Sequence, residues 1–229
     1  MSDTNNTNFN GPINNSGSLA IGPKASIHNY AQPQPQPQSE TTQHVKTTNA
    51  LFVLSNPRGS NSLRLNTEMR AIEEALRLSP QRDRIQSRTL HAATANDLRR
   101  ALLEKPYQII HLSGHGGSDG FMLEDEQGRP HLVSPQALAA YFGIYRQTLR
   151  CVLLNACYTF SMGQHIALGI PYVIAMPGPI QDRASIEFSR GFYDAIGAGL
   201  DIERAYLEGL STVRFAHLDH NFLALLLQE

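Results

Sequence analysis

From Ala50 onward, short apolar runs alternate with segments whose apolar residues recur at helical spacing, and this alternation restricts the fold more than any other feature. The apolar runs have the length of buried strands: 50–55, 84–90, 107–113, 151–156 and 171–176. The segments with helical spacing lie between and after them: 62–79, 93–104, 134–142, 160–169, 182–196 and 202–215. Strands that alternate with helices predict an α/β fold with a mainly parallel sheet and helices on both faces.

Local signals refine this pattern at three places. Thr94 or Asn96 is expected to cap the helix in 93–104, and Ser134 is expected to cap the helix in 134–142, with Pro135 in its first turn. Between these helices, the segment FMLEDEQGRPHLV predicts a hairpin that turns at Glu126–Gly128.

Residues before Ala50 have a different composition. Residues 31–49 contain the tract AQPQPQPQ, which favours an extended linker. Residues 1–30 are rich in Asn and Gly with sparse apolar residues, which is typical either of a disordered tail or of a short assembly motif that stacks as cross-β. We therefore predict three parts: an N-terminal segment 1–30, a linker 31–49 and a folded domain 50–229.

Charge and hydropathy exclude several classes of partner. The formal net charge is −1 and the pI is about 6.8, so the basic excess of a nucleic-acid-binding protein is missing. No apolar run approaches the roughly 20 residues that cross a bilayer, so we expect no membrane partner and a cytoplasmic protein. In an extended strand, Cys151 and Cys157 would lie about 20 Å apart, which predicts free thiols.

Two predicted strands end in residues that carry chemistry. His115 follows the strand in 107–113 within a glycine-rich turn, and Cys157 follows the strand in 151–156. In a parallel α/β sheet, functional sites form at the carboxyl ends of the strands. A base and a thiol are therefore expected on the same edge of the sheet.

This pair predicts nucleophilic catalysis. A helix after Cys157 and a protonated His115 would both stabilise the thiolate, which is the nucleophilic form. In this reading, the N–H groups of Cys157 and Gly116 hold the oxyanion, and His115 gives a proton to the leaving amine. Gly114, Gly116 and Gly117 are expected to allow positive φ and a close approach to a ligand.

Each residue also has a structural explanation. Cys157 alone is more typical of a buried core thiol, and His115 alone of a turn residue. Their joint occurrence, about forty residues apart at neighbouring strand ends, favours the catalytic interpretation. No third catalytic residue stands out, and Asn155 is assigned a supporting role.

The segments IIHLSGHGG and VLLNAC resemble the CHAT proteases, relatives of caspases, separase and gingipains. LFVLSNPRGSNSLRL, GFMLEDEQGRP and the region from Gly169 to Tyr206 are similar to further CHAT segments, so the resemblance covers about 50–215. It implies a caspase-like three-layer sandwich and a cysteine endopeptidase that uses His115 and Cys157. It also implies a protein substrate, no cofactor and a role in prokaryotic antiviral defence or programmed cell death. Tyr158 and Thr159 depart from the small pair usual after the nucleophile, and a bulky Tyr158 is expected to crowd or gate the pocket.

The substrate residue before the cut has three candidate partners, which favour opposite charges. Asp182 matches the position where separase-like relatives carry an acidic residue in the first specificity pocket, which favours Arg or Lys. Asp182 is equally suited to cap a helix beginning at Arg183. Arg58 and Arg64 lie in the loop where caspases hold a substrate aspartate, and they are the rival for specificity.

Other functions fit the sequence less well. A serine esterase would need a G-x-S-x-G turn, which the sequence lacks. The histidines outside the pair show no ligand spacing, so we expect no metal. A non-catalytic scaffold that assembles through residues 1–30 is the main alternative, although such a scaffold would need neither His115 nor Cys157. In the protease interpretation, residues 1–30 and the linker tether the domain to an activator or to a self-assembled platform.

Overall fold

The computed structural model describes residues 47–219 and 223–227, which belong to a compact unit assigned to Val45–Glu229. The predicted assembly segment 1–30 and residues 31–46 of the predicted linker lie outside the described residues. The first described strand begins at Thr48, two residues before the predicted start of the folded domain.

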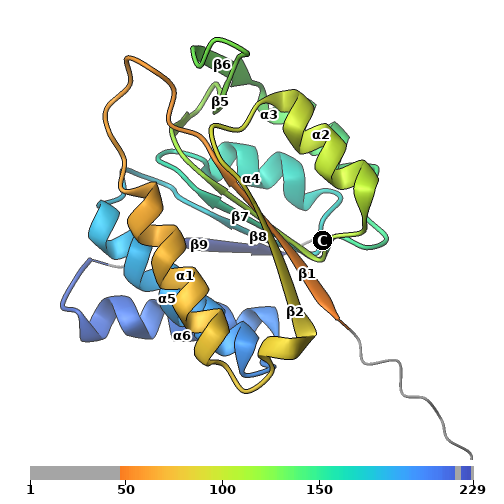
Figure 1. The fold of residues 1–229 in the computed structure, drawn as a ribbon. Coiled ribbons are helices and arrows are strands. Elements are labelled where there is room, and N and C mark those ends of the chain that lie inside the picture. The colour runs from red at the N-terminus through yellow and green to blue at the C-terminus, as the bar shows by residue number, and fades with distance from the viewer. Residues whose placement is uncertain (1–46, 220–222, 228–229) are drawn as a thin grey trace, which may run out of the picture. The chain divides into compact units, whose positions relative to one another are not determined.

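A six-stranded sheet forms the centre of this compact unit (Figure 1). Its strand order is β2-β1-β3-β7-β8-β9, and all neighbouring strands are parallel except the pair β8 and β9. The strands are β1 (Thr48–Leu54), β2 (Ile85–Leu90), β3 (Ile109–Ser113), β7 (Cys151–Asn155), β8 (Tyr172–Ala175) and β9 (Ala224–Leu227). The five predicted strands are thus β1, β2, β3, β7 and β8, and β9 is an addition to the predicted sheet.

Helices cover both faces of this sheet, as the alternating pattern predicts. One face carries α1 (Leu65–Leu78), α5 (Asp182–Gly197) and α6 (Ile202–Phe215); the other carries α2 (Ala95–Glu104), α3 (Pro135–Gly143) and α4 (Phe160–Ala167) (Figure 1). A single 3-10 turn, η1 (Arg82–Arg84), leads from α1 into β2. The result is a three-layer sandwich.

The two faces of the sheet bury two separate apolar cores. Along β1, Phe52 packs into the core under α1, α5 and α6, whereas its neighbour Val53 packs into the core under α2, α3 and α4. Successive side chains of a strand point to opposite faces, so a strand buried on both sides must be apolar throughout. This requirement explains why the predicted strands are continuous apolar runs.

Two of the predicted helix caps are present. Thr94 accepts a hydrogen bond from Asp97 N while the Asp97 side chain accepts one from Thr94 N, a capping box at the start of α2. Ser134 accepts a hydrogen bond from Ala137 N at the start of α3. The side chains at these positions satisfy N–H groups that have no partner within the helix.

The predicted hairpin is part of a second, smaller sheet. It consists of β5 (Gly120–Glu124) and β6 (Pro130–Val133), and β5 also pairs with the two-residue strand β4 (Gly116–Gly117). Because β4 directly follows His115, this small sheet anchors the turn that carries the histidine.

The described residues also bear on the membrane and thiol predictions. Within them, no helix combines the length and the apolar content needed to cross a bilayer. Cys151 is buried and Cys157 is half-buried, and both are free thiols.

Candidate active site

His115 and Cys157 leave the sheet at neighbouring positions. Strands β3 and β7 are parallel neighbours, and their last residues, Ser113 and Asn155, lie opposite each other. His115 and Cys157 each come two residues later, and Gly114 N donates a hydrogen bond to Asn155 O at 3.3 Å. The sheet register therefore places the histidine and the thiol at the same edge.

Both residues line one pocket of about 70 Å³ above the ends of these strands. Five segments form it: the loop before α1 with the start of α1, the end of β3, the end of β7, the loop after β8, and the first turns of α5. Its lining residues are Leu63, Arg64, Leu65, Glu68, Ser113, Gly114, His115, Gly116, Asn155, Cys157, Ile180, Asp182, Ser185 and Ile186.

The loop before α1 orients His115. Nε2 of His115 lies 2.8 Å from the backbone oxygen of Asn61. A carbonyl oxygen only accepts, so Nε2 carries the proton in this hydrogen bond, and in the neutral ring Nδ1 is then a free acceptor. The backbone oxygen of Asn61 is thus the group that orients His115. The sequence did not reveal it, because every residue type has a main-chain carbonyl.

Cys157 is held by the loop that follows β8. Ile180 N donates to Cys157 Sγ at 3.5 Å. The buried Thr159 hydroxyl donates to Ala156 O at 3.0 Å and accepts from Met176 N at 3.1 Å, which ties the turn after β7 to the end of β8. Thr159 is also the N-cap residue of α4, so the helix begins three residues after the thiol.

Gly114 and Gly116 beside His115 act through close approach, whereas a Cβ on Gly117 would meet nothing within 4 Å, and the expectation of positive φ is wrong for all three. A Cβ on Gly116 would lie 2.8 Å from Thr159 Cγ2, 2.9 Å from Ala156 Cβ and 3.1 Å from Cys157 O. A Cβ on Gly114 would lie 2.5 Å from Ser55 O. The absence of a side chain therefore lets the histidine turn pack directly against the cysteine turn.

Tyr158 does not occupy the pocket. Its side chain is 53% exposed, and it is not among the residues that line the pocket, so the expected crowding is not found. Its backbone has φ of 56°, in the left-handed region that is unusual for an aromatic residue, and its N–H donates to Gly178 O. The strain is located at the residue directly after the thiol.

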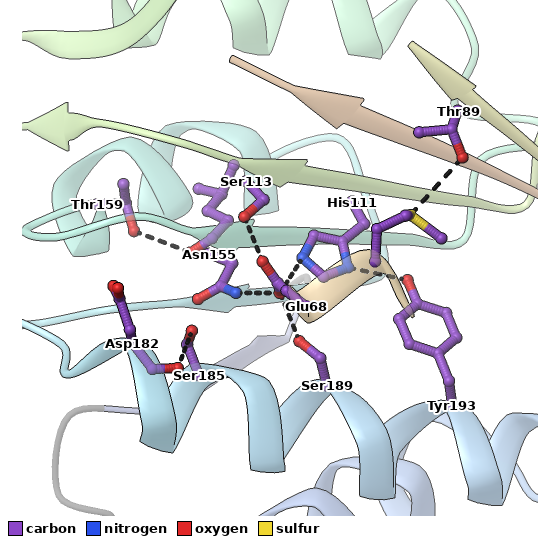
Figure 2. A network of polar contacts seen from close by, with 12 residues as sticks. Glu68, Thr89, His111, Ser113, Asn155, Thr159, Asp182, Ser185, Ser189 and Tyr193 are labelled. Carbon is purple, nitrogen blue, oxygen red and sulfur yellow. Dashed lines mark hydrogen bonds and ion pairs between the residues drawn. The ribbon is translucent and has the colours of Figure 1, made fainter. Parts of the chain in front are cut away.

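A buried carboxylate, Glu68 of α1, is among the residues that line the pocket, and Figure 2 shows the polar contacts around it. It accepts hydrogen bonds from Ser113 Oγ of β3 and from Asn155 Nδ2 of β7. From α5, Ser189 Oγ donates to it at 2.7 Å. Nε2 of His111 lies 3.3 Å from Glu68 Oε1. Glu68 therefore links the two strands that carry the histidine and the thiol.

The donors around Glu68 keep it charged. Burial by itself raises the pKa of a carboxyl, but the interactions with His111 and the hydrogen bonds from Ser113 and Ser189 outweigh burial and hold the pKa of Glu68 below its ordinary value. The sequence offered one signal for this residue. Glu68 lies three residues after Leu65 and four before Ile72, inside the apolar stripe of its helix, where a charge needs buried partners.

The specificity candidates are divided between two places. Asp182 and Arg64 both line the pocket, together with Asn155. Arg58 lies in a different hollow, beside Glu124 and Gly128 of the hairpin. Helix α5 begins at Asp182 with Gln181 as its N-cap residue, so Asp182 does not cap a helix that starts at Arg183.

Known proteins share the family and the fold. The model of the CHAT domain matches residues 16–217. A protein described as a Roc-COR-CHAT protease, from an unknown prokaryotic organism, is 22% identical over 191 residues, which are 76% of this chain and 18% of that protein. A probable protease of Gillisia limnaea is 24% identical over 170 residues, 72% of this chain and 30% of that protein. The chain thus spans less than a third of the length of either relative.

Among solved structures, caspase-1 from Spodoptera frugiperda is similar to this chain, with a TM-score of 0.53 and 10% sequence identity. The likeness covers 80% of this chain and 87% of the caspase. The three-layer sandwich is therefore a caspase-like fold, as the sequence predicted.

Proposed function

The chain belongs to the CHAT domain family, and from this premise we propose that it is a cysteine endopeptidase that cleaves a partner protein. The observation that carries the proposal is that His115 and Cys157 line one pocket at the ends of paired strands. Two relatives described as proteases support it.

In the proposed reaction, His115 Nδ1 takes the proton of the Cys157 thiol, and Sγ attacks the carbonyl carbon of the substrate. The resulting tetrahedral intermediate breaks its C–N bond, and the proton on His115 passes to the leaving amine. Water then attacks the thioester carbon and gives a proton to His115; the C–S bond breaks to release the acid, and His115 returns the proton to Sγ. The hydrogen bond to Asn61 O keeps the proton of the neutral imidazole on Nε2, so that Nδ1 is free to accept the thiol proton.

The proposed oxyanion donors are the N–H groups of Gly116 and Cys157. The close packing of these two turns supports this assignment, because a Cβ on Gly116 would lie 3.1 Å from Cys157 O. Donors held rigidly before the reaction stabilise the developing charge without reorganisation.

We propose a basic residue before the cut, with Asp182 as one of its partners. Asp182 lines the same pocket as the buried carboxylate of Glu68. Of the two candidate arginines, Arg64 lines this pocket and Arg58 lies in a separate hollow. Two carboxylates in one small pocket favour a cationic side chain.

The biological setting is a further part of the proposal. The resemblance to CHAT proteases implies a cytoplasmic role in prokaryotic defence or cell death. Residues 1–30 are proposed to assemble the chain or to bind an activator; they lie outside the described residues.

Cleavage of a fluorogenic peptide library tests the proposal, with the wild type, Cys157→Ala and Cys151→Ala compared at equal concentration. We expect cleavage after Arg or Lys that Cys157→Ala abolishes. Cys151→Ala is the matched control: its thiol is buried, and burial raises the pKa of Cys151 to about 12, so it is not a nucleophile at neutral pH.

Each other outcome has a definite meaning. Cleavage after Asp would move specificity to Arg64. Cleavage that persists in Cys157→Ala would refute the nucleophile. No cleavage by the wild type, with or without assembly, would favour the non-catalytic scaffold.

A further inference from the structure

The order of the strands shows on which side of the thiol the leaving half of a substrate would lie. Cys157 follows β7, His115 follows β3, and β1 and β2 lie beyond β3 in the sheet. In the proposed reaction, His115 gives a proton to the leaving amine, so this amine lies on the β3 side of Cys157. The substrate residues after the cut therefore continue over the carboxyl ends of β1 and β2.

Two hollows lie at these strand ends, next to the catalytic pocket. The first, of about 300 Å³, extends from the loop before α1 to the loop after β2, and Leu63 and Leu65 line both this hollow and the pocket. The second, of about 630 Å³, lies at the turn of the β5–β6 hairpin and shares Ala92 and Glu124 with the first. Because each cavity shares lining residues with the next, the hollows lead from the pocket to the hairpin.

Glu124 lines both hollows and is a nearly buried carboxylate without a cationic partner. Its side chain accepts a hydrogen bond from Asn56 N at 3.2 Å, and its own N–H donates to Ala93 O at 2.9 Å. It is 8% exposed, and none of the ion pairs in the part of the chain that the structure describes involves it. Burying a charge without an opposite charge is unfavourable, so a cation that enters the hollow should bind here.

The other charges at the hairpin leave this carboxylate unneutralised. Asp125 pairs with Arg129 at 2.7 Å, and Glu126 adds a further, exposed carboxylate. Arg58 lines the second hollow as well, but it is exposed and forms no ion pair with a described residue. The balance of charge therefore favours a cationic side chain beside Glu124.

The small sheet sets the distance between the histidine and this carboxylate. Met122 N donates to His115 O at 2.9 Å, and Glu124 lies two residues further along β5. Two residues of a strand span about 7 Å, and an extended peptide covers the same length with two residues. The second or third residue after the cut therefore comes within reach of Glu124.

We propose that the two hollows bind the substrate on the leaving side of the cut, and that Glu124 accepts a hydrogen bond from a Lys or Arg side chain at the second or third position after it. Glu124 is thus a specificity-determining residue outside the catalytic pocket. This inference rests on the proposed protease function and deepens it by assigning a separate binding region to the protein substrate.

Internally quenched peptides with Lys, Gln or Glu at both of these positions test the proposal. The wild type should cleave the Lys peptide with a kcat/KM about tenfold higher than the Gln peptide, mainly through KM, and the Glu peptide more slowly still. Glu124→Gln should remove this preference, while its amide oxygen still accepts from Asn56 N. Mass spectrometry of the fragments shows that all peptides are cut at the same bond.

Two controls separate the hollows from the activity itself. A substrate with an aminocoumarin leaving group has no residues after the cut, so Glu124→Gln should change its cleavage less than twofold. Glu208→Gln removes an exposed carboxylate from α6, which lines neither hollow, and should leave the preference for Lys unchanged.

A binding measurement distinguishes this inference from the protease proposal. In Cys157→Ala, fluorescence anisotropy measures the affinity of the labelled Lys and Gln peptides without turnover. The Lys peptide should bind about tenfold more tightly, and adding Glu124→Gln should abolish the difference. Thermal unfolding shows whether each variant is folded.

The outcomes are distinct. Binding that depends on Glu124 without cleavage by the wild type would support the hollows and count against the protease. Cleavage without a preference for Lys, or with a preference that Glu124→Gln leaves intact, would overturn the inference and leave the protease standing. If Glu124→Gln does not fold, the wild type alone still decides: equal cleavage of the three peptides would refute the site.

Discussion

At the scale of single residues, Glu68 is the most consequential side chain that has no chemical step of its own. It is 3% exposed and charged, and its partners come from β3, β7 and α5. Removing one member of a buried charged network leaves the other members unpaired, which is commonly more destabilising than losing a surface ion pair. The stability of the domain should therefore depend on the charge of this carboxylate.

The first residue-scale prediction is a pH dependence of stability. The pKa of Glu68 lies below its ordinary value of 4.5 in the folded protein. Its contribution is therefore complete above about pH 4.5 and is lost as the pH falls through the folded-state pKa. Glu68→Gln should lower the free energy of unfolding by about 3 kcal/mol at neutral pH and make its decline in acid shallower.

Guanidinium denaturation at a series of pH values measures this effect. Glu73→Gln is the control, since Glu73 is an exposed glutamate on the same helix. A Glu68→Gln variant whose stability parallels the wild type at every pH would contradict the predicted linkage.

At the scale of elements, the site depends on how closely two turns approach each other. The turn after β3 reaches the turn after β7 at Gly116, which leaves no room for a Cβ, whereas a Cβ on the next residue, Gly117, would meet nothing within 4 Å. Two adjacent glycines of the same short strand, β4, therefore differ in what they permit.

The prediction at this scale compares Gly116→Ala with Gly117→Ala. Gly116→Ala should push the two turns apart, cost about 1 to 3 kcal/mol of stability and slow peptide cleavage at least tenfold. Gly117→Ala should change stability by less than about 0.5 kcal/mol. Thermal unfolding and cleavage rates give the comparison, and equal effects of the two variants would show that the close approach is unimportant.

The secondary structure was largely predictable from the sequence because burial imposes a pattern on each element. The first helix is an instructive exception: it was expected over 62–79, but α1 begins at Leu65. The residues just before α1 form a loop instead. In this loop, the backbone oxygen of Asn61 contacts His115, and Leu63 lines the pocket. Strands β4 and β9 were also missed; the two residues of β4 carry too little periodicity to identify a strand.

At the scale of the whole molecule, one sheet separates two cores. Phe188 is fully buried in the core under α1, α5 and α6, and Phe142 is fully buried in the core under α2, α3 and α4. Because the central strands contribute alternate residues to both cores, neither core is complete without the sheet. The two cores should lose their structure together.

The whole-molecule prediction is a single unfolding transition that responds to either core. Phe142→Ala and Phe188→Ala should each lower the free energy of unfolding by about 3 to 5 kcal/mol. Both should shift the same transition, whether it is followed by far-UV or near-UV circular dichroism. Separate transitions, each sensitive to one substitution, would show that the layers unfold independently.

The sequence by itself determined the layers of the fold and brought His115 and Cys157 to one edge of the sheet. Apolar runs of strand length require burial on both faces, and a histidine and a cysteine placed after two such runs must emerge at the carboxyl edge of the sheet. Asn155, Asp182 and Arg64 were also named in advance, because each lies near a strand end, a helix start or the loop after β1.

Only the tertiary structure decided how these residues work together. The Asn61 carbonyl, the Ile180 N–H and the Glu68 carboxylate come from segments distant in the chain. Their roles depend on orientation across the pocket. The register of β3 and β7 and the packing of α1 against α5 set that orientation. Periodicity reports which face of an element is buried, but a hydrogen bond between distant segments depends on where both of its ends lie in space.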